Sequence, residues 1–179
     1  PPEARGLSRD QVRLMVSYRK DNQIVHTSFR HLPDFLDAGD LLVINTSKTL
    51  NAALNATLSD GTAVELHLST HLPADLWVVE LRLPEGDGTQ PYGNIHAGER
   101  VQLEDGGWVI LLTPYRAEQR TENPGNSLRR LWIAELHIPE PLDNYLQKYG
   151  FPIRYRYVHG SWPLEYYQTV YATEPGSAE

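Results

Sequence analysis

The sequence predicts a mixed α/β, or α+β, body with an inserted antiparallel β-barrel. Short alternating apolar segments, separated by turn residues, fill the middle of the chain, which is the pattern of a barrel or sandwich. The flanking parts mix helix and strand signals instead. We therefore predict a discontinuous α/β body of residues 1–55 and 139–179 and an inserted β-barrel of residues 56–138.

The distribution of charge supports the same division. The net charge is −7 for the whole chain, and it is concentrated in the middle. Residues 1–50 sum to +1, residues 51–140 to −7 and residues 141–179 to −1. An acidic middle argues against a phosphate-binding face there, because such faces collect Lys and Arg.

The body contains four predicted elements. Two apolar-rich runs around the polar turn RKDNQ predict a hairpin over residues 13–29, and HLPDFLDAGD predicts a short helix ending at Gly39. The run LLVINTS, residues 41–47, predicts a central strand buried on both faces. PEPLDNYLQKYG predicts a helix that begins at Pro141 and ends at Gly150.

The inserted barrel rests on segments with a period of two. In TAVELHLST, Val64, Leu66 and Leu68 face one side, whereas Glu65 and His67 face the other. Loops rich in Gly, Pro and Asn separate the segments. The predicted strands cover residues 62–70, 76–83, 99–103, 107–113 and 129–137.

Composition excludes several classes of protein. The sequence has no cysteine, which excludes disulfides, thiolate catalysis and Cys-ligated zinc and is compatible with a cytoplasmic location. No stretch is long and apolar enough to span a membrane. A first residue that is not Met and a final GSAE predict that the chain is a fragment.

Three apparent motifs favour structural interpretations. GDGTQPYG, residues 86–93, is followed by a strand-like segment instead of a helix, so it indicates a hairpin loop and not a dinucleotide site. His67 and His71 lie in an alternating segment without the Glu of a zinc protease, so both are expected to be surface or loop residues. No serine lies in a nucleophile elbow, and no metal site is predicted.

Two polar segments are candidate binding sites. Asn45, Thr46, Ser47 and Lys48 follow the apolar run, where a strand end could hold a polar ligand or simply form a capped turn. RYRYVHGSW, residues 154–162, interleaves Arg and Tyr, as in surfaces that stack on bases, although a packed strand edge fits this pattern better.

Four stretches carry a family resemblance: SRDQVRLMV (8–16), FRHLPDFLDAGDLLVIN (29–45), FPIRY (151–155) and YQTVYATEPGSAE (167–179). They resemble the S-adenosylmethionine:tRNA ribosyltransferase-isomerase (QueA) family of queuosine biosynthesis. They follow the family's order and span nearly the whole chain, and the last is the most specific. The resemblance implies that the C-terminal portion of the body is missing from this chain.

The resemblance implies an α/β body with an inserted β-barrel and an enzyme without a metal. The implied reaction transfers the ribosyl part of S-adenosylmethionine, a co-substrate, to 7-aminomethyl-7-deazaguanine in tRNA, with isomerisation of the ribose. The general base is not identified from the sequence. Expected substrate-binding residues are Asn45, Ser47, Lys48, Tyr167, Gln168 and Thr169. Four further residues match family positions and are expected to hold phosphate or form structural ion pairs: Arg9, Asp10, Arg13 and Arg154. Asp10 and Arg13 are three residues apart, which suits such an ion pair.

The sequence also departs from the family pattern. Thr46 replaces an Asp, Lys48 and Ala53 replace Arg residues, Asn51 replaces a Pro, and Tyr166 replaces an Arg. Thr46 removes an acid, and Lys48 lacks the planar bidentate fork of Arg. These losses predict a diverged member of the family. Two alternatives remain open: a non-catalytic module that binds a nucleoside, S-adenosylmethionine or a protein partner, and a barrel that binds single-stranded RNA by stacking.

Overall fold

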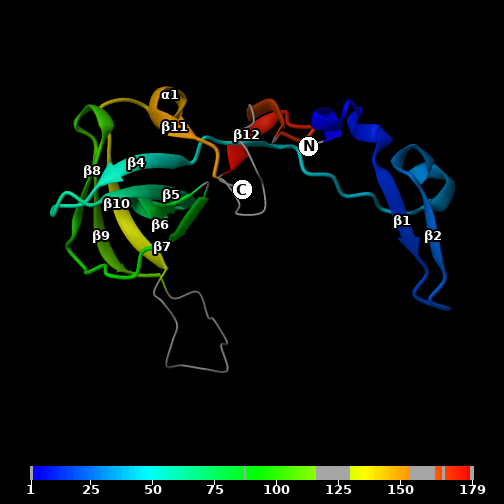
Figure 1. Cartoon of the computed structure of the whole chain (residues 1–179), viewed down its shortest axis with the longest axis horizontal. Helices are drawn as coiled ribbons and strands as arrows, with labels where there is room; N and C mark the ends of the chain where they lie inside the picture. The colour runs from blue at the N-terminus through cyan, green and yellow to red at the C-terminus, as the bar shows by residue number, and fades with distance from the viewer. Residues whose placement is uncertain (1, 87, 116–129, 154–163, 167, 178–179) are drawn as a thin grey trace. The chain divides into compact units, whose positions relative to one another are not determined.

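The structure is a computed structural model that describes residues 2–86, 88–115, 130–153, 164–166 and 168–177 (Figure 1). The chain divides into two compact units, residues 1–45 and residues 46–179. Each unit is described by itself.

The first unit contains the predicted hairpin, which is confirmed. Strands β1 (Arg13–Ser17) and β2 (Ile24–Ser28) pair antiparallel. The predicted short helix is a 3-10 helix, η3 (Phe29–Phe35), and Gly39 lies beyond it in a turn with φ of +103°. Two further 3-10 turns, η1 (Pro2–Arg5) and η2 (Arg9–Gln11), precede the hairpin.

The prediction of a buried strand over residues 41–47 is wrong. Residues 41–46 form no strand, and Leu41 and Val43 are 89% and 82% exposed. A strand buried on both faces needs a hydrogen-bonded neighbour on each edge, and no described strand pairs with residues 41–45. Strand structure begins only at β3 (Ser47–Thr49), which pairs parallel with β12 (Glu174–Ser177).

The second unit is built on a closed antiparallel barrel, as predicted (Figure 1). Its strands follow one another around the barrel in the order β10, β9, β8, β4, β5, β6, and β6 pairs again with β10. β7 extends one edge of β6, and β11 pairs with β4. The strands are β4 (Ala53–Thr57), β5 (Ala63–Leu72), β6 (Leu76–Glu85), β7 (Gly88–Pro91), β8 (Arg100–Leu103), β9 (Trp108–Pro114), β10 (Leu131–His137) and β11 (Gly150–Phe151).

Alternation places the apolar side chains inside the barrel. Val64, Leu66 and Leu68 are at most 2% exposed and join one core cluster with residues from every strand of the closed barrel. Their neighbours Glu65 and His67 face the other side and bond to each other, with His67 Nε2 3.0 Å from Glu65 Oε2. His67 is only 6% exposed, so the expectation of a surface histidine is wrong at this position.

Two hairpins use left-handed backbone at their tips. The β8–β9 turn, η5 (Glu104–Gly106), places Asp105 at φ 51° and Gly106 at φ 74°, the Asp-Gly combination that tight hairpins favour. The β5–β6 loop, η4 (Pro73–Asp75), has Ala74 at φ 62° and Asp75 at φ 54°. The second loop is therefore left-handed at two residues that carry a Cβ, which is an unfavourable conformation.

Helix α1 (Leu142–Tyr149) lies across one end of the barrel (Figure 1). Tyr145 and Leu146 are buried in the barrel core, and the Tyr145 hydroxyl donates to the carbonyl oxygen of Glu104 at 2.6 Å. The predicted helix end at Gly150 is confirmed, but Gly150 is extended, with φ of −85°. A Cβ at Gly150 would lie 2.3 Å from the carbonyl oxygen of Asn51, so glycine is needed for close approach to the chain entering β4.

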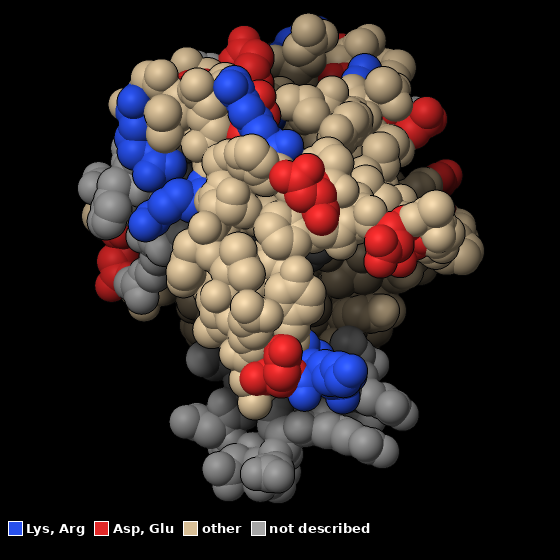
Figure 2. Space-filling view, turned by 90° about the vertical axis from the view of Figure 1, so that its right-hand side faces the viewer, with Lys and Arg blue, Asp and Glu red and all other residues tan. Residues whose placement is uncertain are grey.

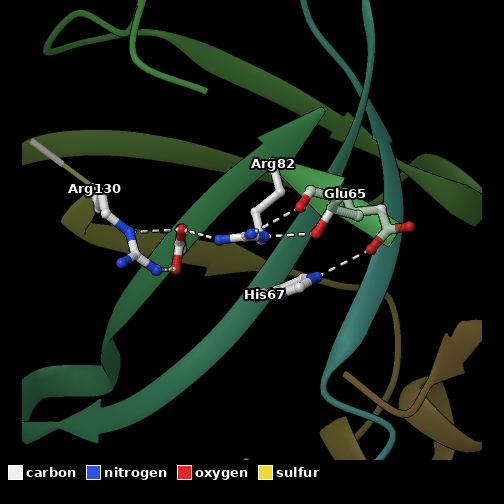
Figure 3. A network of polar contacts seen from close by, with 6 residues as sticks. Glu65, His67, Arg82 and Arg130 are labelled. Atoms are coloured by element: carbon white, nitrogen blue, oxygen red, sulfur yellow. Dashed lines mark hydrogen bonds and ion pairs between the residues drawn. The ribbon is translucent and has the colours of Figure 1, made fainter. Parts of the chain in front are cut away.

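A buried polar network lies on β6 and its neighbours (Figure 3). Glu80 binds Arg82 and accepts two hydrogen bonds of 3.1 Å from Arg130. Arg82 also donates to Thr89 through Nε at 2.6 Å and through Nη2, to the carbonyl oxygen, at 3.0 Å. These bonds tie β6 to β7 and to the start of β10.

The boundary between body and barrel stays a prediction. β4 begins at Ala53, which lies within the segment assigned to the body, and β11 joins the same sheet from the C-terminal side. The first predicted body segment is also divided at residues 45 and 46.

We expect Tyr145→Phe to lower the free energy of unfolding by about 1 kcal/mol at neutral pH, because the Glu104 carbonyl loses its donor. Burial raises the pKa of Tyr145 from 10.0 to about 12, so the folded state favours the neutral phenol. This stabilisation is complete below pH 10 and is lost as the pH rises through about 12. Urea unfolding across this range should therefore show a steeper fall in stability for the unsubstituted protein than for the variant. Equal slopes of unfolding free energy against pH for the two proteins would contradict this role of Tyr145.

We expect Glu80→Ala to destabilise the fold by about 3–5 kcal/mol, because it leaves the Arg82 guanidinium, whose side chain is only 16% exposed, without its carboxylate. Arg130→Ala is the matched control. Its side chain is 50% exposed, so its loss should lower stability by less than about 1 kcal/mol. Both values come from chemical denaturation, and similar losses for the two variants would argue against a buried network.

Candidate functional site

The candidate site begins at the small parallel sheet of β3 and β12. The backbone N–H groups of Thr173 and Glu174 donate to the carbonyl oxygen of Thr46 at 2.9 and 3.0 Å. Gln168 binds Thr49 at two points: its Oε1 accepts from the Thr49 N–H and its Nε2 donates to the Thr49 carbonyl oxygen, both at 2.7 Å. The Gln168 amide therefore imitates the backbone of a neighbouring strand.

Gly176 allows β12 to approach β3. A Cβ at this position would lie 2.5 Å from the carbonyl oxygen of Lys48 and 2.6 Å from Leu50 Cδ2. Backbone cannot yield to such a contact, so a side chain at residue 176 would separate the two strands. The sequence PGS thus supports the close pairing that brings the C-terminal segment to Lys48.

A groove lies between β3, β12, helix α1 and the β5–β6 hairpin. Its deeper part has a volume of about 410 Å³ and is lined by Leu50, Leu68, Trp77, Leu142 and Leu146, among others. A wider outer part, of about 1090 Å³, adds the polar residues Lys48, Thr49, Asn51, Asp75, Asp143, Gln147 and Thr173. These volumes and the apolar floor with a polar rim are typical of small-molecule sites.

The rim combines an aromatic surface with charges of both signs. His71 stacks on Trp77 with ring centroids 4.6 Å apart, and His71 Nε2 lies 3.5 Å from Asp75 Oδ1. The exposed Lys48 comes from β3, and the exposed Asp143 comes from the first turn of α1. Such a groove can bind a flat, partly apolar molecule that carries both a cation and an anion.

Three of the predicted residues of the second unit, Ser47, Lys48 and Gln168, lie in or beside this groove. Lys48 lines the groove directly, and Ser47 precedes it in β3. Gln168 is held against Thr49, which also lines the groove. Thr169 is partly buried, and its Oγ1 accepts from the Tyr171 N–H at 3.4 Å. Tyr167 and Arg154 lie outside the described residues.

The remaining predicted residues belong to the first unit. Arg9 bonds to Glu3 through Nε at 2.7 Å. Asp10 pairs with Arg30 at 2.7 Å instead of with Arg13, so the expected ion pair between residues three apart is wrong. Hydrogen bonds from Ser8 and Arg30 lower the pKa of Asp10. Arg13 begins β1, and Asn45 is exposed after the irregular segment.

Sequence reasoning missed most of the groove. The sequence did not indicate Trp77, Asp75 or Asp143 as site residues. His71 was predicted to be a surface residue, and its side chain is 54% exposed. These residues come from separate hairpin and helix segments, so no local spacing joins them. The available signal was Trp77, near the start of a predicted strand that directly follows a short loop with Asp75.

Two further observations concern metal ions and membranes. Among the described residues, no group of three or more His, Asp or Glu side chains is placed to hold a metal ion. No helix in the described part of the chain is long and apolar enough to cross a membrane.

Comparisons with known proteins agree on one family. Residues 1–179 match the family model described as queuosine biosynthesis protein. S-adenosylmethionine:tRNA ribosyltransferase-isomerases are similar over most of this chain: that of Thermotoga maritima is 32% identical over 171 residues, which are 94% of this chain and 44% of the relative. That of Symbiobacterium thermophilum is 33% identical over 175 residues, 95% of this chain and 45% of the relative.

The crystal structure of S-adenosylmethionine tRNA ribosyltransferase from Thermotoga maritima matches 76% of this chain and 42% of its own chain, with 25% identity and a TM-score of 0.34. The chain spans less than half the length of the curated relatives named above. Because the family model covers all its residues, the chain belongs to the queuosine biosynthesis protein family.

Proposed function

We propose that this chain is the part of an S-adenosylmethionine:tRNA ribosyltransferase-isomerase that binds S-adenosylmethionine. The groove beside β3 is the proposed site. The observation that carries the proposal is the presence of Lys48, Asp143 and the His71–Trp77 stack around one apolar groove, in a chain of this family.

The chemistry of the groove suits the parts of S-adenosylmethionine. The adenine is flat and apolar on its faces, and it fits against Trp77 and the leucines of the floor. The methionine carboxylate would pair with Lys48, and the ammonium group with Asp143. A sulfonium is a cation, so it is attracted both to the face of Trp77 and to Asp75.

Gln168 and Gly176 have positioning roles in this proposal. Gln168 fixes the backbone of Thr49, and Gly176 lets β12 pack beside Lys48. Both hold the β3 wall of the groove, so the family-like segment at the end of the chain contributes by shaping the site.

The reaction and its RNA partner are proposals taken from the family. The relatives' name combines S-adenosylmethionine with tRNA, and we infer the same pair for the full-length protein, with a cytoplasmic location. The net charge of −7 does not itself favour RNA, and the face in Figure 2 shows Lys and Arg in separate groups among uncharged and acidic residues.

We expect Lys48→Ala to weaken S-adenosylmethionine binding by about tenfold or more, because a charge-assisted contact to the carboxylate contributes about 1.5–3 kcal/mol. Calorimetric titration of the full-length protein measures this. Lys148→Ala is the matched control, because this substitution also removes one lysine charge. Lys148 lies on α1 and binds Glu140, outside the groove. Equal affinities of the Lys48 and Lys148 variants would contradict the proposed site.

Activity separates the enzyme from the alternative of a non-catalytic module. Full-length protein, S-adenosylmethionine and tRNA bearing 7-aminomethyl-7-deazaguanine should together release adenine. Saturable binding of S-adenosylmethionine without release of adenine would instead support the binding module.

A further inference from the structure

The β5–β6 loop keeps an unfavourable backbone at the edge of the groove. Ala74 and Asp75 both have positive φ, at 62° and 54°. Non-glycine residues rarely adopt this conformation, and such outliers cluster where function requires them. The side chains of this loop are therefore candidates for a functional role.

The β8–β9 hairpin provides the comparison within the same barrel. There the second left-handed residue is Gly106, which has no Cβ and adopts the conformation easily. At the corresponding place the β5–β6 loop has Asp75, and its carboxylate oxygen lies 3.5 Å from His71 Nε2. Glycine would fit the backbone better, but it would leave His71 without this nearby carboxylate.

His71 is held from two sides. Trp77, on the neighbouring strand, stacks on its ring, and Asp75 approaches Nε2. Among the described residues, the other charged groups that line the same groove are Lys48 from β3 and Asp143 from α1. Among these side chains, an imidazole is the group that enzymes use most often as a general base.

Building on the proposed function, we propose that His71 is the general base of the reaction and that Asp75 is its positioning residue. With the Nε2 proton directed to Asp75, the lone pair is on Nδ1. The C–H bond beside the sulfonium breaks, its electron pair stays on carbon next to the positive sulfur, and its proton moves to Nδ1. The resulting imidazolium, facing Asp75, then holds the proton that the departing adenine requires.

The test uses full-length protein and measures adenine release with S-adenosylmethionine and the modified tRNA. His71→Ala should lower the rate at saturating S-adenosylmethionine by about 10²–10⁴-fold, a larger loss than any fall in calorimetric affinity for S-adenosylmethionine. Added imidazole should restore part of the rate, and exchange of the ribose hydrogen beside sulfur with solvent deuterium should be lost. A His71→Ala protein that binds S-adenosylmethionine and keeps the rate would overturn the assignment.

Asp75→Gly provides an independent arm, because it removes the carboxylate and relieves the backbone. We expect a melting temperature about 2–4 °C higher together with a rate about tenfold lower. Asp105→Gly, in the other hairpin, and His137→Ala, outside the groove, should leave the rate unchanged. If His71→Ala does not fold, the Asp75→Gly rate decides: a full rate overturns the assignment. Absence of activity in the unsubstituted protein would instead overturn the proposed function, on which the assignment rests.

Discussion

The hydrogen bond from Tyr145 to the Glu104 carbonyl is the contact on which the rest of the second unit depends. It joins the only described α-helix to the turn between β8 and β9, and it does so at a side chain with no exposed surface. The same helix closes the barrel core through Leu146 and supplies a wall of the groove. Stability and ligand binding therefore share one element, and damage to the helix would affect both.

Five of the six strands of the closed barrel could be predicted from the sequence, because alternation records which face of a strand is buried. Val64, Leu66 and Leu68 illustrate this, since each is inside and each is two residues from the next. The strands β4, β7, β11 and β12 were not predicted. Gly, Pro and Ser dominate β12 and β7, and these residues form strands here only because a partner strand is available.

The groove could be predicted only in part. Lys48 and Gln168 were reached through their place in family-like stretches, but Trp77 and Asp143 meet Lys48 only after the barrel has closed and α1 has packed. The apolar run at residues 41–46 shows the opposite limit. Its composition resembles a buried strand, yet burial requires neighbours that a local pattern does not contain.

The clamp between Gln168 and Thr49 has a consequence for association between molecules. Because backbone groups of successive residues in a strand point to opposite edges, Thr46 faces β12 and Thr49 faces the other edge of β3. An uncovered edge invites a strand from another chain to add to the sheet. The Gln168 side-chain amide occupies the backbone groups of Thr49 at this edge. A side chain has no further backbone groups to pair with another strand, so we expect it to block edge-to-edge association at Thr49.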